Sequence, residues 1–122
     1  MATVKGMLEK VLDDLRSVGD IEASAIVSRD GLLMASDMAT GINAETFAAM
    51  SATMLGAAET AASELGRGLP DRVIVESEET KLIAIGTGPK ALLVVMTSPE
   101  AGLGLILIEL GKAADKIKMI LG

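Results

Sequence analysis

Apolar residues recur every three or four positions near both ends of the chain, as expected of helices with one buried face. The first such segment covers residues 2–18, and its polar face carries Lys10 and Asp14 four positions apart. The last segment begins near Gly102, and its apolar positions are Leu103, Ile106, Leu107, Leu110, Ala114, Ile117 and Leu121. The spacing therefore predicts an amphipathic helix at each end of the chain.

Five shorter segments have the apolar patterns of strands. Residues 23–28 and 32–36 flank Arg29-Asp30-Gly31, which is turn chemistry and predicts a hairpin. Three further strands are predicted over residues 72–77, 81–87 and 91–97, and their connections are short enough for antiparallel hairpins. Because the run from Leu92 to Met96 is apolar on both faces, we expect helices on both sides of the sheet.

A third helix is predicted over residues 44–65, with Asn43 as its N-cap. Two stripes with helical spacing run along it. We expect the stripe with the larger side chains to face the sheet: Phe47, Met50, Met54, Ala58, Ala61 and Leu65. The neighbouring stripe is small and mostly apolar, and we expect it to face outward: Ala48, Ser51, Ala52, Leu55, Ala62 and Gly66.

An outward helix face normally carries Lys and Glu, yet this helix holds only the charges of Glu45, Glu59 and Glu64. Small residues also let another backbone approach closely, so we interpret the second stripe as a contact with another copy of the chain. The alternative is an alanine-rich surface helix without a partner. The predicted dimer interface combines this helix with the strand after Pro70, a short alternating edge strand. It comprises Ala48, Ser51, Ala52, Leu55, Glu59, Ala62, Arg72, Val73, Ile74, Val75 and Glu76.

Length and composition narrow the function classes. The 122 residues fit a single domain over residues 1–122, half of them are hydrophobic, and Phe47 is the one aromatic residue. With a net charge of −6 and no aromatic platform, the chain does not match a nucleic-acid-binding protein. Its apolar runs are too short for membrane insertion, and charges interrupt the first segment where a secretory signal would be apolar. Without cysteine, a cytoplasmic location is the default expectation.

Candidate chemistry is sparse. The chain has neither His nor Cys, which removes the commonest general base, the thiol nucleophile and most zinc sites. Asp13 and Asp14 are adjacent, but neighbours on a helix point about 100° apart, so a solvated face explains them better than a metal site. The turn suffices to explain Asp30, and no carboxylate pair stands out for acid–base chemistry. We predict no catalytic residue, no cofactor and no metal site.

The order and spacing of several segments resemble the roadblock (dynein light chain) family in its short prokaryotic form. The resemblance covers nearly all of the chain and rests on motifs that are weak singly: Ser28-Arg29-Asp30-Gly31-Leu32, the alanine-rich helix ending Glu64-Leu65-Gly66, Leu92-Leu93-Val94-Val95-Met96-Thr97, and Ala101-Gly102-Leu103-Gly104-Leu105 leading into Glu109-Leu110 and Ala113-Ala114. Two features depart from the family pattern. Gly102 stands where Asn is common, which affects helix capping. The start of the last helix is unusually apolar, which indicates an extra contact or tighter packing against the first helix.

The resemblance implies an α+β, profilin-like fold with a five-stranded antiparallel sheet in the order 2-1-5-4-3. The middle helix would cover one face and the terminal helices the other. It also implies a homodimer with paired third strands and antiparallel middle helices. Family members act as non-enzymatic platforms for Ras-like small GTPases, as in bacterial gliding polarity, or as adaptor subunits. We therefore expect a homodimeric regulator that binds a small GTPase. The alternatives are a structural adaptor without nucleotide sensitivity and, less favoured, a small-ligand sensor.

Overall fold

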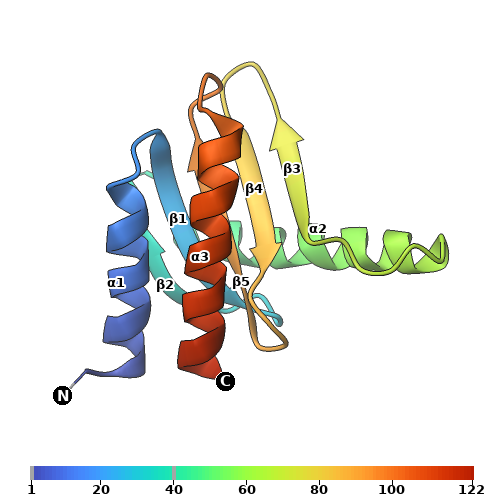
Figure 1. Cartoon of the computed structure of the whole chain (residues 1–122), viewed down its shortest axis with the longest axis horizontal. Helices are drawn as coiled ribbons and strands as arrows, with labels where there is room; N and C mark the ends of the chain where they lie inside the picture. Colours follow the sequence, from blue (N-terminus) through green and yellow to red (C-terminus); the bar gives the residue numbers. More distant parts are fainter. Residues whose placement is uncertain (1, 40) are drawn as a thin grey trace.

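The computed structural model describes residues 2–39 and 41–122. Its helices and strands, labelled in Figure 1, follow the order α1 (Val4–Arg16), β1 (Ile21–Ser28), β2 (Leu33–Asp37), α2 (Ala44–Glu64), β3 (Arg72–Glu76), β4 (Lys81–Gly86), β5 (Ala91–Thr97) and α3 (Leu103–Leu121). All the predicted elements are present, and their boundaries differ from the predicted ones by at most two residues.

The five strands form one antiparallel sheet in the order β2-β1-β5-β4-β3, which confirms the expected topology. Strand β5 lies at the centre, where Val94 pairs with Ala25 of β1 on one side and with Ala84 of β4 on the other. The edges of the sheet are β2 and β3, so β3 is an edge strand as predicted.

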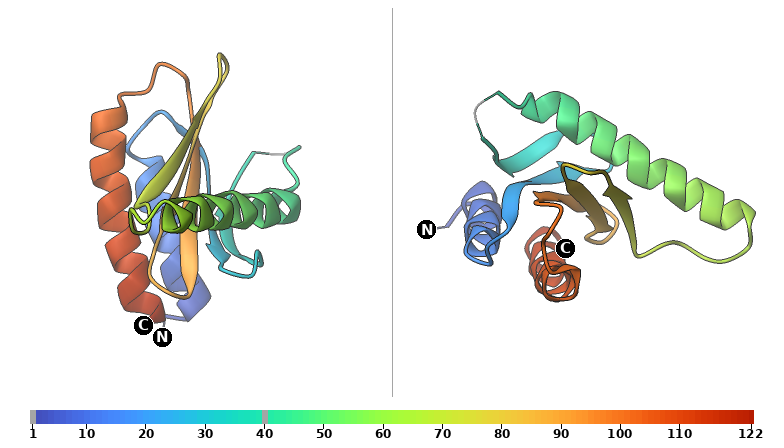
Figure 2. Two further views of the ribbon diagram at one scale, coloured as in Figure 1. Left: turned by 90° about the vertical axis from the view of Figure 1, so that its right-hand side faces the viewer. Right: turned by 90° about the horizontal axis from the view of Figure 1, so that it is seen from above.

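Helices cover both faces of the sheet (Figure 2). Helices α1 and α3 pack side by side on one face, where their apolar residues join Ile26, Ile83, Leu93 and Val95 in the larger core. Helix α2 crosses the other face, above a smaller cluster that includes Ala25, Val27, Leu92 and Val94. Since β5 contributes to both clusters, it is buried on both sides, as its apolar sequence predicts.

Local sequence features explain the start of α2, the turn that packs on it and the start of α3. The Asn43 side chain accepts a hydrogen bond from the Thr46 amide at 3.0 Å, which confirms the predicted N-cap. Gly31, in the β1–β2 turn, has a positive φ of 89°. A Cβ atom at Gly31 would lie 3.3 Å from the Ala49 Cα, so the turn packs directly on α2. At α3, Gly102 is an N-cap without a side-chain hydrogen bond, as its departure from the family pattern implies.

The prediction of which α2 face meets the sheet is wrong in part: Phe47 and Met54 of the predicted inward stripe do pack against the smaller core, but the small stripe is buried more deeply. Leu55 is 0% exposed and packs in the smaller core with Ala48, whereas Met50 is 59% exposed. Ser51 is also buried, and Leu65 is exposed. Both stripes have helical spacing, so periodicity does not separate them. The small stripe faces inward because α2 lies close to strands whose own residues are small, Ala25 and Ala84 among them.

Candidate interaction surface

The outward face of α2 carries no charge between Thr46 and Ser63. Its exposed residues are Thr46, Met50, Thr53, Ala57, Thr60 and Ala61. Helix α2 therefore has one face packed against the sheet and a second, uncharged face open to solvent. Exposed helix faces are normally charged, so this one is a candidate contact surface.

The one charge in the middle of α2 is used inside the chain. The Arg29 guanidinium forms an ion pair with the Glu59 carboxylate, with Nη1 3.2 Å from Oε1 and 3.3 Å from Oε2. The same guanidinium donates to the Gly88 carbonyl oxygen, through Nη2 at 2.9 Å and Nε at 3.3 Å. Arg29 thus ties α2 to the β1–β2 turn and the β4–β5 turn, and it neutralises the charge in the middle of α2 within the chain.

Strand β3 leaves one side of its backbone unpaired. The Ser77 amide donates to the Thr80 carbonyl at 2.9 Å, and the register continues with Val75 opposite Leu82. Because hydrogen-bonded residues alternate along an antiparallel pair, Val75 and Val73 pair with β4. The backbone groups of Ile74 and Glu76 therefore point toward the open edge.

The C-terminal part of α2 extends past β3, beyond the edge of the sheet (Figure 2). Leu65 and Leu69, which follow this part of the helix, are exposed, and so is Val75 on β3. The α2–β3 surface, defined here as the outward face of α2, the open edge of β3 and residues 65–69, combines uncharged side chains with unpaired backbone groups. Surfaces of this composition favour protein–protein contacts over chemistry.

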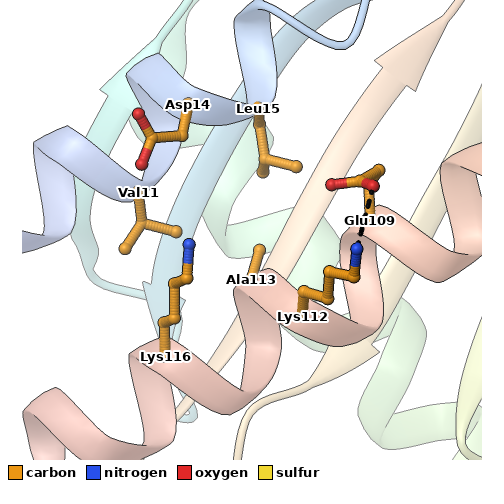
Figure 3. Close-up of a pocket in the computed structure, with 7 residues that line it drawn as sticks. All are labelled: Val11, Asp14, Leu15, Glu109, Lys112, Ala113 and Lys116. Atoms are coloured by element: carbon orange, nitrogen blue, oxygen red, sulfur yellow. Dashed lines mark hydrogen bonds and ion pairs between the residues drawn. The ribbon is translucent and has the colours of Figure 1, made fainter.

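Two hollows elsewhere in the described residues are small or polar. A cleft of about 50 Å³ lies between α1 and α3, with Val11, Leu15 and Ala113 among its lining residues and charged side chains at its rim (Figure 3). A cavity of about 200 Å³ lies where Lys5 and Glu9 approach β2. Neither borders the α2–β3 surface.

Residues 2–39 and 41–122 contain no group of three or more acidic side chains placed to hold a metal ion. Within the same residues, no helix has the length and apolar character needed to cross a membrane.

The family model of the Roadblock/LC7 domain matches residues 7–97, which include most of α1, all of α2 and all five strands. The chain belongs to the Roadblock/LC7 family. The roadblock domain is generally an adaptor fold. Of the motifs that carried the resemblance in the sequence, the β1–β2 turn, the alanine-rich α2 and the strand β5 lie inside the matched range, whereas the segment over residues 101–114 lies outside it.

One sequence relative and two solved structures are similar to this roadblock chain. The uncharacterized protein MJ0310 of Methanocaldococcus jannaschii is 38% identical over 112 residues, which cover 92% of this chain and 97% of that protein. MglB of Myxococcus xanthus has the same fold, with a TM-score of 0.89, 23% identity, and coverage of 96% of this chain and 89% of MglB. Profilin II of Acanthamoeba castellanii aligns with a TM-score of 0.66 and 22% identity over 89% of this chain and 94% of profilin, which bears out the profilin-like expectation.

The interface residues predicted for this roadblock chain divide into three groups. Ala48, Ser51 and Leu55 are buried against the sheet, so their assignment to an outer contact is wrong. Five residues are half-buried: Ala52, Glu59, Ala62, Val73 and Ile74. Ala52 packs against the smaller core, and the Glu59 carboxylate is paired with Arg29. Arg72, Val75 and Glu76 are exposed at the open edge.

Met50, Thr53 and Ala57 are exposed on the outward face of α2, and the prediction did not assign them to the interface. The position of Glu59 was the one feature of the sequence that could have indicated which face of α2 points outward. A single charge in the middle of a helix marks one face, and the opposite face is then uncharged.

Proposed function

We propose that the chain acts as a cytoplasmic homodimer of a single roadblock-like domain, joined through the α2–β3 surface. The uncharged outward face of α2 supports this, because it leaves threonine and alanine where exposed helices carry charge. The α2 helices of two copies pack antiparallel, and their small residues permit a close approach. In this dimer, the part of α2 that extends past β3 packs on the second copy instead of being exposed to solvent.

Edge pairing completes the dimer. The unpaired backbone groups of Ile74 and Glu76 on one copy meet those of the second copy, and the two sheets become one continuous sheet. Such an isologous contact uses the same patch on both copies. The family resemblance implies the same arrangement.

The dimer can be tested by changing Ala57, at the centre of the uncharged face, to Glu. We expect Ala57→Glu to dissociate the dimer at micromolar concentration while leaving the circular dichroism spectrum of the monomer unchanged, since Ala57 is exposed. The matched control is Ala39→Glu at an exposed loop position, which should remain dimeric. Light scattering that gives the mass of one chain for the unmodified protein would refute the dimer.

For function, we propose that this dimer is a non-enzymatic regulator that binds a Ras-like small GTPase and modulates its nucleotide cycle. Roadblock family members are platforms for such GTPases, and the similarity to MglB agrees with a GTPase-regulating role. The chain would act without supplying a catalytic group, by ordering the switch loops of the GTPase. The proposal rests on the uncharged α2 face beside the open edge of β3, found in a chain of the Roadblock/LC7 family.

The experiment mixes the purified protein with small GTPases from the same source, each loaded with GDP or with a non-hydrolysable GTP analogue. We expect co-elution with one of them in one nucleotide state only, and a changed rate of GTP hydrolysis or nucleotide exchange. Equal binding to the GDP-loaded and GTP-loaded forms, or no complex with any GTPase, would favour the alternative that the chain is a structural adaptor. The sensor alternative is weaker because the space between the sheet and α2 is filled by Leu55, Val27 and Val94, each 0% exposed.

A further inference from the structure

Helix α3 has a second regular stripe that the fold does not use. Its inward residues, such as Ile106 and Leu110, pack in the larger core. On the opposite side, Leu105, Ile108, Lys112, Asp115 and Met119 are all exposed. Leu105 and Ile108 are each 59% exposed and Met119 is 83% exposed. The apolar start of α3 therefore does not reflect tighter packing against α1.

The spacing of this outer stripe is that of a coiled-coil seam. Its five residues are separated by three, four, three and four positions, which is the alternation of the a and d sites of a heptad repeat. A heptad seam keeps facing a partner helix along its whole length. A helix that simply covers a core does not need one on its solvent side.

The stripe is also its own complement when a second α3 runs antiparallel. In that arrangement a and d sites of opposite helices lie side by side. Ile108 then meets Met119 of the second copy, and Lys112 meets Asp115 of the second copy. Each pair occurs twice by symmetry, with apolar contacts outside and two opposite-charge pairs at the centre. Parallel helices would instead place Lys112 against Lys112 and Asp115 against Asp115.

We propose that the outer face of α3 is a second self-association surface, on which α3 of another copy packs antiparallel. Among the residues that the structure describes, the Asp115 carboxylate forms no ion pair, and a second copy supplies Lys112 to it, which a lipid surface or an uncharged apolar partner does not. Lys112 now pairs with Glu109 at 3.4 Å, and its side chain is 65% exposed, so it is free to turn toward the new partner (Figure 3).

This surface does not compete with the α2–β3 surface, because α3 and α2 lie on opposite faces of the sheet (Figure 2). A chain that uses both contacts assembles beyond a dimer, either as a closed tetramer or as an open array. The α3 contact does not depend on the α2 contact, so each can fail without the other.

Disulfide trapping tests the antiparallel geometry, since the natural chain has no cysteine. We expect a mixture of Ile108→Cys and Met119→Cys proteins to give the mixed disulfide at least tenfold in excess of either homodisulfide under mild oxidation. In the proposed register the two Ile108 positions are eleven residues out of line, about 16 Å along the helix, which is too far for a disulfide. Predominant Ile108–Ile108 disulfides, equal amounts of all products, or no product would each overturn the proposal.

Charge reversal provides a second test that keeps the apolar residues in place. Lys112→Glu and Asp115→Lys should each weaken α3-mediated association at least tenfold in sedimentation velocity, and the double variant should restore it. Running all proteins with Ala57→Glu removes the α2 contact, so the measurement reports α3 alone. Circular dichroism checks that each variant keeps its helix content. Single reversals without effect, or a double variant that is weaker than both, would refute the pairing.

Discussion

Replacement of Leu55 by Ala probes the assignment of the inward face of α2. Leu55 is 0% exposed, and its neighbours in the smaller core include Ala25 and Ala84, whose side chains are too short to fill the space that a truncated Leu would leave. Large-to-small changes at such sites cost about 3–5 kcal/mol when the surroundings do not collapse. That is a large part of the total stability of a domain of this size, about 5–15 kcal/mol.

The assay is urea or thermal unfolding followed by circular dichroism, at one fixed protein concentration because association also stabilises the folded state. For a chain of 122 residues, each kcal/mol corresponds to about 4 °C, so Leu55→Ala should lower the midpoint by about 12–20 °C. The matched control is Leu32→Ala, the same change at a side chain that is 69% exposed, which should cost no more than about 0.5 kcal/mol.

A Leu55→Ala protein that unfolds within about 1 kcal/mol of the unmodified one would refute the assignment of Leu55 to the core. The same result would indicate that Leu55 lies on the outward face of the helix, where its truncation would weaken dimerisation and leave the stability of the fold unchanged. The two outcomes are separated by measuring the unfolding midpoint and the association state of each variant.

Three further changes test other parts of the structure. Glu76→Pro removes an amide that points to the open edge and should weaken the dimer in sedimentation, whereas Val75→Pro removes an amide paired with β4 and should instead lower the thermal midpoint. Gly31→Ala places a side chain at a φ of 89° and should destabilise the fold by about 1–2 kcal/mol in urea unfolding; a neutral result would contradict the close packing of the turn on α2. Arg29→Met leaves the Glu59 carboxylate without its counter-charge and should cost about 1–3 kcal/mol by the same measurement, while no loss would show that the ion pair is not needed.

Patterns within one element were enough to place most of the secondary structure. Apolar spacing located the helices and strands, the Asn43 cap marked the start of α2, and the glycine in Arg29-Asp30-Gly31 marked the hairpin turn. These features depend on residues that are close in the sequence, so they can be predicted without knowledge of the fold. The double-sided burial of β5 was predictable for the same reason, because its apolar residues alternate between both faces.

The orientation of α2 and the contents of its surfaces were decided by tertiary structure alone. Leu55 and Met50 both occupy apolar stripes, and only the depth at which α2 rests on Ala25 and Ala84 selects which one is buried. The ion pair between Arg29 and Glu59 joins residues thirty positions apart, which no local pattern relates. The family resemblance predicted the strand order, but which α2 residues face outward depends on how closely two packed layers approach, and that distance is a property of the folded chain.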